Sequence, residues 1–253
     1  MSPIAETLIV FACVFGSGVL GLYLRRVLPQ QHLQEDSLAM VRLCTGVIAT
    51  LSALVLGLLV ASSKATYDRV NDQVTTTAAA IVLLDRALAQ YGAQTNEVRG
   101  SLRAAVGSTV DTLFAEHSHG VAEFDTRAAL ARGENLQAEL RRLTPENDAQ
   151  RVLQARALEL SSQVAQTRML AITQAQTSLP PVFVVILVLW LSIMFAGFGL
   201  VTKSNATVIV TLFLSALSVA GAVLMIEELN RPLEGLMRVS SAPMRYALAH
   251  LGL

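Results

Sequence analysis

The chain is 253 residues long, with 53% hydrophobic and only 15% charged residues. Soluble domains average about 25% charged residues, so this composition excludes an ordinary soluble enzyme. Nineteen basic and nineteen acidic residues give a net charge of zero, and without a basic excess a nucleic acid is not an expected partner. The two cysteines, Cys13 and Cys44, lie in or beside apolar stretches and predict neither a disulfide framework nor a cysteine-rich metal site.

Four charge-free apolar stretches are long enough to cross a membrane. A helix that rises 1.5 Å per residue needs about 20 apolar residues to cross a hydrocarbon layer of about 30 Å. The first stretch is as long as a signal peptide, but Arg25 and Arg26 follow it where small residues at a cleavage site are expected. We therefore expect this segment to be retained. The predicted membrane helices cover about residues 5–24, 43–63, 180–201 and 205–226.

The charged residues are concentrated between the second and third spans. Twelve of the nineteen basic and thirteen of the nineteen acidic residues lie between Lys64 and Arg168, so this segment is expected outside the membrane. No Pro or Gly occurs from Leu58 to Tyr91, and apolar residues recur there at spacings of three, four and seven. This pattern predicts that the second membrane helix continues into water as one long helix, which Gly92 can end.

Further helices are predicted in the rest of the extramembrane segment. We expect a helix over residues 95–116, a turn at residues 117–120 and a weaker helix over residues 128–143. A last helix should begin at Thr144-Pro145, because threonine is a favourable N-cap and proline a favourable first helical residue. This helix should reach Gln176.

The predicted fold class is an all-α integral membrane protein, in which four transmembrane helices carry a domain of long bundled helices inserted between spans two and three. Beyond Pro232, apolar positions indicate an amphipathic tail that lies on the membrane surface or on the helical domain. Basic residues flank the spans on both sides, so the positive-inside rule leaves the orientation open. The predicted domains are 1–63 and 179–226 for the membrane helix pairs, 64–178 for the helical domain and 227–253 for the tail.

The second span carries two faces that bear on function. One consists of small residues and suits close packing against another helix. The other is mostly apolar and would form a neck if several subunits turned it toward a shared axis, where such a constriction gates by dewetting. No ionisable residue lies inside a span core, which disfavours a pump. The packing face comprises Gly46, Ala49, Ala53 and Gly57, and the neck face comprises Thr50, Leu54, Leu58 and Ala61.

Motifs for catalysis and metal binding are lacking in the sequence. It contains no phosphate-binding loop, no dinucleotide fingerprint, no nucleophile elbow and no zinc-protease motif. His117 and His119 are two potential metal ligands, but no carboxylate or cysteine pattern accompanies them. We therefore expect no enzyme activity, no cofactor and no metal.

Several stretches at the membrane boundaries resemble known proteins. Leu56-Gly57-Leu58, followed by residues 65–69, resembles the end of the pore helix of bacterial bestrophins, and residues 227–233 resemble the stretch that closes their last membrane helix. Residues 54–64, 81–91 and 240–245 are similar to the bacterial bestrophin-like family of unknown function, over nearly the full length. The boundary residues that carry the likeness are Tyr67, Asp68, Arg69, Glu227, Glu228 and Pro232.

The resemblance implies a homo-oligomer, and the bestrophin parallel implies a pentamer that conducts chloride along its fivefold axis through an apolar neck of the second span. The register of that neck can be counted in two ways. Counting from Gly57 places Thr50, Leu54 and Leu58 in the neck, whereas counting back from Tyr67 places Ala53, Gly57 and Ala61 there. The sequence leaves both registers open.

Two functional hypotheses follow. The first is a bestrophin-like channel for small anions such as chloride, a multi-pass protein of a bacterial inner membrane whose partners are the lipid bilayer and copies of itself. The second is a non-conducting membrane scaffold or signalling protein whose helical domain binds a partner. The second is motivated by Val70-Asn71 and Asn230-Arg231, which stand where bestrophins have paired tryptophans and a Glu-Asp pair.

Overall fold

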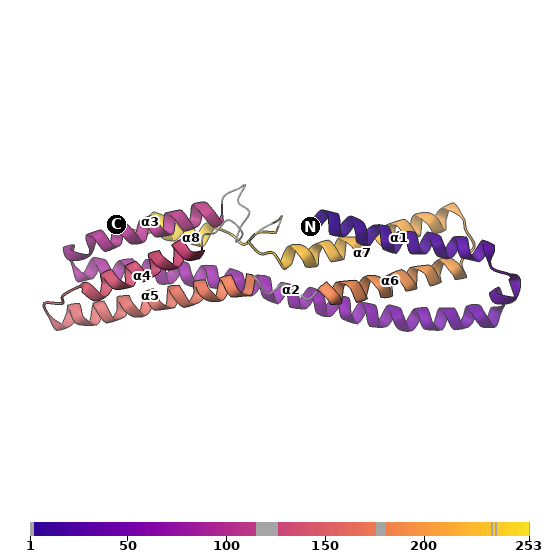
Figure 1. Ribbon diagram of the computed structural model, residues 1–253, viewed down its shortest axis with the longest axis horizontal. Helices are drawn as coiled ribbons and strands as arrows, with labels where there is room; N and C mark the ends of the chain where they lie inside the picture. Colours follow the sequence, from indigo (N-terminus) through magenta and orange to yellow (C-terminus); the bar gives the residue numbers. More distant parts are fainter. Residues whose placement is uncertain (1–2, 115–125, 176–180, 234, 236, 253) are drawn as a thin grey trace. The chain divides into compact units, whose positions relative to one another are not determined.

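The computed structural model describes residues 3–114, 126–175, 181–233, 235 and 237–252. These residues form an all-α protein with two short 3-10 turns, η1 (Gln30–Leu33) and η2 (Ala93–Thr95). The turn expected at residues 117–120 and the helix end expected at Gln176 lie outside the described residues. The α-helices are α1 (Pro3–Val27), α2 (Glu35–Tyr91), α3 (Asn96–Leu113), α4 (Thr126–Arg142), α5 (Asp148–Ala175), α6 (Pro181–Val201), α7 (Ala206–Leu229) and α8 (Ala242–His250) (Figure 1).

The chain divides into two compact units. The membrane unit comprises Met1–Thr66 and Leu179–Asn230, and the extramembrane unit comprises Tyr67–Ser178 and Arg231–Leu253. Helix α2 contributes to both, because it runs without a break over 57 residues. The continuous helix predicted from the absence of Pro and Gly after Leu58 is therefore confirmed, and Gly92 ends it with a φ of 125° that favours glycine.

Four helices of the membrane unit, α1, α2, α6 and α7, are long and apolar enough to cross a bilayer. Helix α1 packs against α6 and α7. Glycines set the distance between α1 and α6: a Cβ atom at Gly21 would meet the backbone of Ala196, and one at Gly199 would meet the backbone of Gly18. In lipid, such close approach of two backbones takes the place of apolar burial as the source of helix association.

Polar groups complete the ends of the membrane helices. The Nη1 of Arg25 donates to the carbonyl oxygens of Leu200 and Val201, both at 2.7 Å, so a cation satisfies carbonyls at the C-terminus of α6. At the start of α7, the side chain of Asn205 accepts a hydrogen bond of 2.8 Å from the backbone N–H of Val208. Arg25, in the last turn of α1, thus has a structural role beyond any effect on orientation.

The extramembrane unit is held by an apolar core. Helices α3, α4, α5 and α8 contribute to it together with the second part of α2. Ile81, Leu84 and Leu88 on α2 therefore form one buried face, and Val98, Leu102, Val106 and Val110 on α3 form another. The largest contributors include Ile81, Leu84, Leu88, Val98, Leu102, Val106, Leu140, Leu160 and Leu251.

A buried ion pair crosses this core. Asp85 of α2 is fully buried, and its two carboxylate oxygens accept from Nε and Nη2 of Arg99 on α3, at 2.8 and 3.0 Å. The hydrogen bonding with Asp85 raises the pKa of the Arg99 guanidinium, although burial alone would lower it. A bidentate pair of this kind fixes the position of one helix against the other.

The start of α5 differs from the prediction. The helix begins at Asp148, not at Thr144-Pro145. The side chain of Asn147 accepts from the backbone N–H of Gln150 at 2.9 Å, and the Oε1 of Gln150 accepts from the backbone N–H of Glu146 at 2.6 Å. These two side chains together satisfy two backbone N–H donors. The single hydroxyl of Thr144 could satisfy only one.

The C-terminal segment lies on the helical domain. Met244 and Ala247 of α8 are buried in the extramembrane core. Two arginines hold the end of the chain: Arg86 donates to the carbonyl oxygen of His250 at 2.9 Å, and Arg103 donates to that of Leu251 at 2.8 Å. Of the two positions predicted for the tail, the structure therefore favours the bundle over the membrane surface.

Candidate functional site on the second membrane helix

The membrane part of α2 has one face that packs inside the chain. Its buried residues are Thr45, Ser52, Leu59 and Ser63, spaced by seven and four as expected of one face of a helix. The hydroxyl of Thr45 lies against Gly197 of α6, where a Cβ atom would come within 2.5 Å of it. Three of the four buried residues of this face thus bear a hydroxyl group, and the fourth is a leucine.

The predicted neck residues all lie on the outer side of α2. Leu54 and Leu58 are 71% and 68% exposed, and Thr50 and Ala61 are also exposed. The hydroxyl of Thr50 donates to the carbonyl oxygen of Gly46 at 3.0 Å, so it is satisfied within its own helix. What remains on this face is a smooth, uncharged surface, which other copies of the chain or lipid can cover.

The small residues of α2 lie beside this face. Gly46, Ala53 and Gly57 are exposed, and Ala49 is half-buried. A Cβ atom at Gly46 or Gly57 would meet nothing within 4 Å. Among the described residues, Gly46 and Gly57 therefore bring no other helix close, and the predicted packing role of the four small residues remains a prediction.

The boundary residues lie in α2 and at or just after the end of α7. The hydroxyl of Tyr67 donates to the carbonyl oxygen of Arg238 at 3.4 Å, which links α2 to the segment that follows α7. Asp68 and Arg69 are exposed one turn above the span. At the end of α7, Glu228 is buried and Glu227 is half-buried. Pro232 follows the helix, and its carbonyl oxygen accepts from the N–H of Val239 at 2.8 Å.

Sequence reasoning missed the glycines that pack the membrane unit. Small residues were sought on the second span, whereas the close backbone contacts involve Gly18 and Gly21 of α1 and Gly199 of α6. The signal was present, since residues 16–21 contain three glycines and residues 197–199 contain two. Spacing alone does not distinguish a glycine that meets a neighbour from one that faces outward.

The described residues hold no group of three or more His, Cys, Asp or Glu side chains that could bind a metal ion. Residues 43–63, which contain the outer face of α2 in the predicted span, include no charged residue.

The comparisons with known proteins agree with this architecture. The sequence matches the family described as the Bestrophin-like domain over residues 11–244. No match is found among the curated proteins.

Solved structures of a bacterial bestrophin homologue from Klebsiella pneumoniae are similar in fold. An aspartate-to-alanine variant has a TM-score of 0.70 at 13% identity and covers 97% of both chains. A leucine-to-threonine variant has a TM-score of 0.68 at 14% identity, again covering 97% of both. A tryptophan-to-alanine variant has a TM-score of 0.68 at 15% identity and covers 99% of this chain and 97% of that one.

Proposed function

Because the chain belongs to the Bestrophin-like domain family, we propose that it forms a homo-oligomeric channel, a pentamer, that passes small anions such as chloride. The family is known for anion channels rather than enzymes, and the bestrophin fold extends over the whole chain. The proposed location is the inner membrane of a bacterium. The proposed path runs along the axis of the oligomer, between the α2 helices of its subunits.

The outer face of α2 is the observation that carries this proposal. It presents leucines that are about two-thirds exposed on the single chain, with a threonine and small residues between them. A pump would require ionisable groups inside the membrane, whereas an apolar neck passes an anion without a buried charge and closes by dewetting.

The buried face of α2 also indicates which of its residues would line the proposed neck. Successive residues of a helix are rotated by about 100°, so the row directly opposite Ser52 and Leu59 contains Thr50, Leu54, Gly57 and Ala61. Leu58 lies at the edge of that row. If the packed face points away from the axis, the narrowest part of the proposed neck combines residues from both of the registers read in the sequence, with Leu54 as its largest side chain.

The test is chloride flux from liposomes that hold the purified protein, run beside a mass measurement of the oligomer in detergent. We expect a pentamer that conducts. Leu54→Ala should change flux several-fold by widening the neck, and Gly57→Leu should reduce flux by narrowing the neck about one helical turn away. Leu58→Ala should have a smaller effect, because this side chain lies off the axis.

The matched control is Leu217→Ala on α7, which removes a leucine that is 52% exposed but belongs to another helix. It should leave flux unchanged. A folded pentamer in which neither Leu54→Ala nor Gly57→Leu alters flux would show that this face does not line the path. A pentamer with no flux at all would favour the non-conducting scaffold, and residues 64–178 would then serve as bait for its partner.

A further inference from the structure

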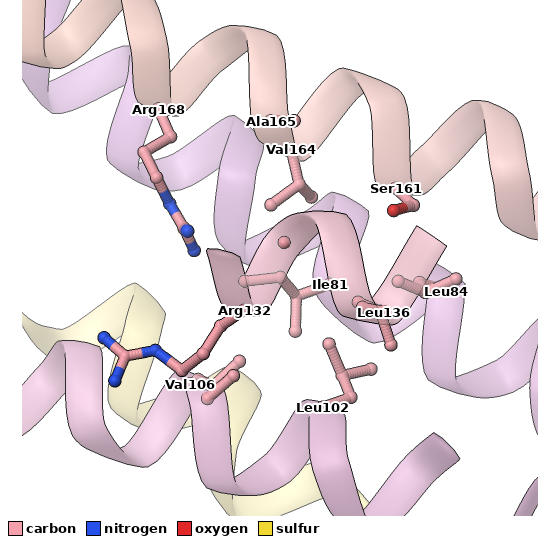
Figure 2. Close-up of a pocket in the computed structure, with 12 residues that line it drawn as sticks. Ile81, Leu84, Leu102, Val106, Arg132, Leu136, Ser161, Val164, Ala165 and Arg168 are labelled. Atoms are coloured by element: carbon pink, nitrogen blue, oxygen red, sulfur yellow. The ribbon is translucent and has the colours of Figure 1, made fainter. Parts of the chain in front are cut away.

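A small cavity of about 50 Å³ lies within the extramembrane unit, among α2, α3, α4 and α5. Figure 2 shows apolar side chains from all four helices turned toward it. The small residues Ala105, Gly133 and Ala165 border it as well. Its larger apolar residues are Ile81, Leu84, Leu102, Val106, Leu136 and Val164.

One buried hydroxyl group also borders this cavity. It belongs to Ser161 of α5, a residue that is 5% exposed. Other hydroxyl groups of the same helices bond within their own helix: Thr167 donates to the carbonyl oxygen of Gln163, and Thr109 donates to that of Ala105, both at 2.9 Å. Ser161 forms no hydrogen bond within the described part of the chain. A buried hydroxyl without a partner is costly, so a ligand that supplies one would stabilise this place.

Two arginines, Arg132 of α4 and Arg168 of α5, complete the border. In Figure 2 their guanidinium groups extend to one side of the cavity, and Ser161 lies at the other. The end of the cavity near Ser161 therefore offers a ligand one hydroxyl group and apolar surface. A charged group placed at that end would lose its hydration for a single hydrogen bond, so a neutral ligand is favoured there.

We propose that this cavity binds a short primary alcohol, whose hydroxyl group bonds with Ser161 and whose alkyl chain fills the apolar space. A hydroxyl group both donates and accepts, so one alcohol molecule gives Ser161 its partner. Water is a poorer occupant, because it needs two to four polar partners and most residues around the cavity are apolar. The proposed channel function assigns no ligand to this place, and this proposal does not depend on it.

The volume sets the length of the alkyl chain. A single water needs a cavity of about 10–15 Å³, and one of about 150 Å³ holds benzene. A cavity of about 50 Å³ therefore suits a molecule of about two to four non-hydrogen atoms. Ethanol and propanol meet this limit, whereas a longer alcohol would have to displace the surrounding helices.

The test follows binding of fluoroethanol to the full-length protein in detergent by fluorine NMR. We expect saturable line broadening that non-fluorinated alcohols reverse by competition. Methanol, ethanol, propanol, butanol and hexanol, all primary and unbranched, form the series, and ethanol or propanol should compete most strongly. Partition into the detergent would instead increase steadily along the series, because each added CH₂ group favours transfer out of water.

Ser161→Ala keeps the space and removes the hydrogen-bond partner. It should weaken fluoroethanol binding by about threefold to tenfold, as expected for the loss of one neutral hydrogen bond. The matched control is Ser162→Ala, which removes the hydroxyl of the next residue of α5. Ser162 is half-buried and is not among the residues that border the cavity, so binding should stay unchanged.

A second variant keeps Ser161 and enlarges the space. Val106 borders the cavity and is 4% exposed, and Val106→Ala removes two methyl groups from its wall. The strongest competitor should then be butanol or hexanol. This variant and the wild-type series still decide the matter if Ser161→Ala fails to fold. Absence of saturable binding, competition that rises up to hexanol in the wild type, an unchanged order in Val106→Ala, or full binding by Ser161→Ala would each overturn the proposal.

Discussion

Close contacts between a glycine and the backbone of a facing helix occur in the membrane unit and at none of the described helical glycines of the extramembrane unit. In the membrane unit, Gly21 and Gly199 lie where a Cβ atom would meet the backbone of the facing helix. In the extramembrane unit, Gly100 of α3 and Gly133 of α4 lie where a Cβ atom would meet nothing within 4 Å. The same residue type, in the same helical conformation, is therefore required at Gly21 and Gly199 and replaceable at Gly100 and Gly133.

The difference follows from the solvent of each unit. Lipid is as apolar as a leucine side chain, so helices in a membrane gain little from burying leucines and associate through close backbone packing. Helices in water gain about 25 cal/mol for each Å² of apolar surface that they bury, and the extramembrane unit buries large side chains from five helices. Glycines there only weaken the helices that contain them.

The largest expected effect concerns the ion pair that crosses the extramembrane core. Asp85→Ala leaves the Arg99 side chain, which is 15% exposed, without its bidentate partner, and removal of one member of a buried pair costs about 3–5 kcal/mol. Heating the purified protein in detergent should show unfolding of the helical domain at a much lower temperature. The double variant Asp85→Ala/Arg99→Leu should recover much of the loss, because no buried charge then remains. Equal melting of wild type and Asp85→Ala would show that the pair is not buried in solution.

The next largest loss of stability is expected for Gly21→Ala. Its methyl group would press on the backbone of Ala196, and overpacking of this kind costs about 1–3 kcal/mol, or roughly 2–4 °C of melting temperature for each kcal/mol. The matched control is Gly16→Ala in the same helix, where a Cβ atom would meet nothing within 4 Å. Loss of folded protein in both variants would mean that glycine is needed throughout α1 and not at one contact.

The sequence was enough to predict those features that depend on one continuous segment of the chain. The four spans and the long α2 follow from hydropathy and from the absence of helix breakers, both of which are local properties. The Asp85–Arg99 pair joins residues of two helices, and the contact of Gly21 with Ala196 joins α1 to α6, so neither could be predicted without the helix arrangement. The start of α5 was misplaced because Asn147 and Gln150 compete with Thr144 as capping residues, and local propensity does not rank them.

Gly100→Ala should stabilise the protein, whereas Gly21→Ala should destabilise it. Alanine restricts the unfolded chain and favours the helix, which is worth about 0.5–1 kcal/mol in an exposed helix interior. The melting temperature should rise by roughly 1–4 °C. A fall would show that the exposed side of α3 is covered in the assembled protein, for example by another copy of the chain, and the comparison of the two units would then have to include contacts between subunits.

The smallest effect is expected for Arg156→Gln on α5. Arg156 forms an ion pair of 2.7 Å with Glu159, but the two side chains are 51% and 67% exposed, and exposed pairs at this spacing contribute about 0.5 kcal/mol or less. The melting temperature should shift by no more than about 2 °C, and the shift should shrink as salt is added. The exposed pair has one short contact, whereas Asp85 is buried and accepts two hydrogen bonds from Arg99, so burial and hydrogen bonding together separate the two effects. A large fall in melting temperature that does not change with salt would instead show that the face of α5 that carries Arg156 is buried in an interface between subunits.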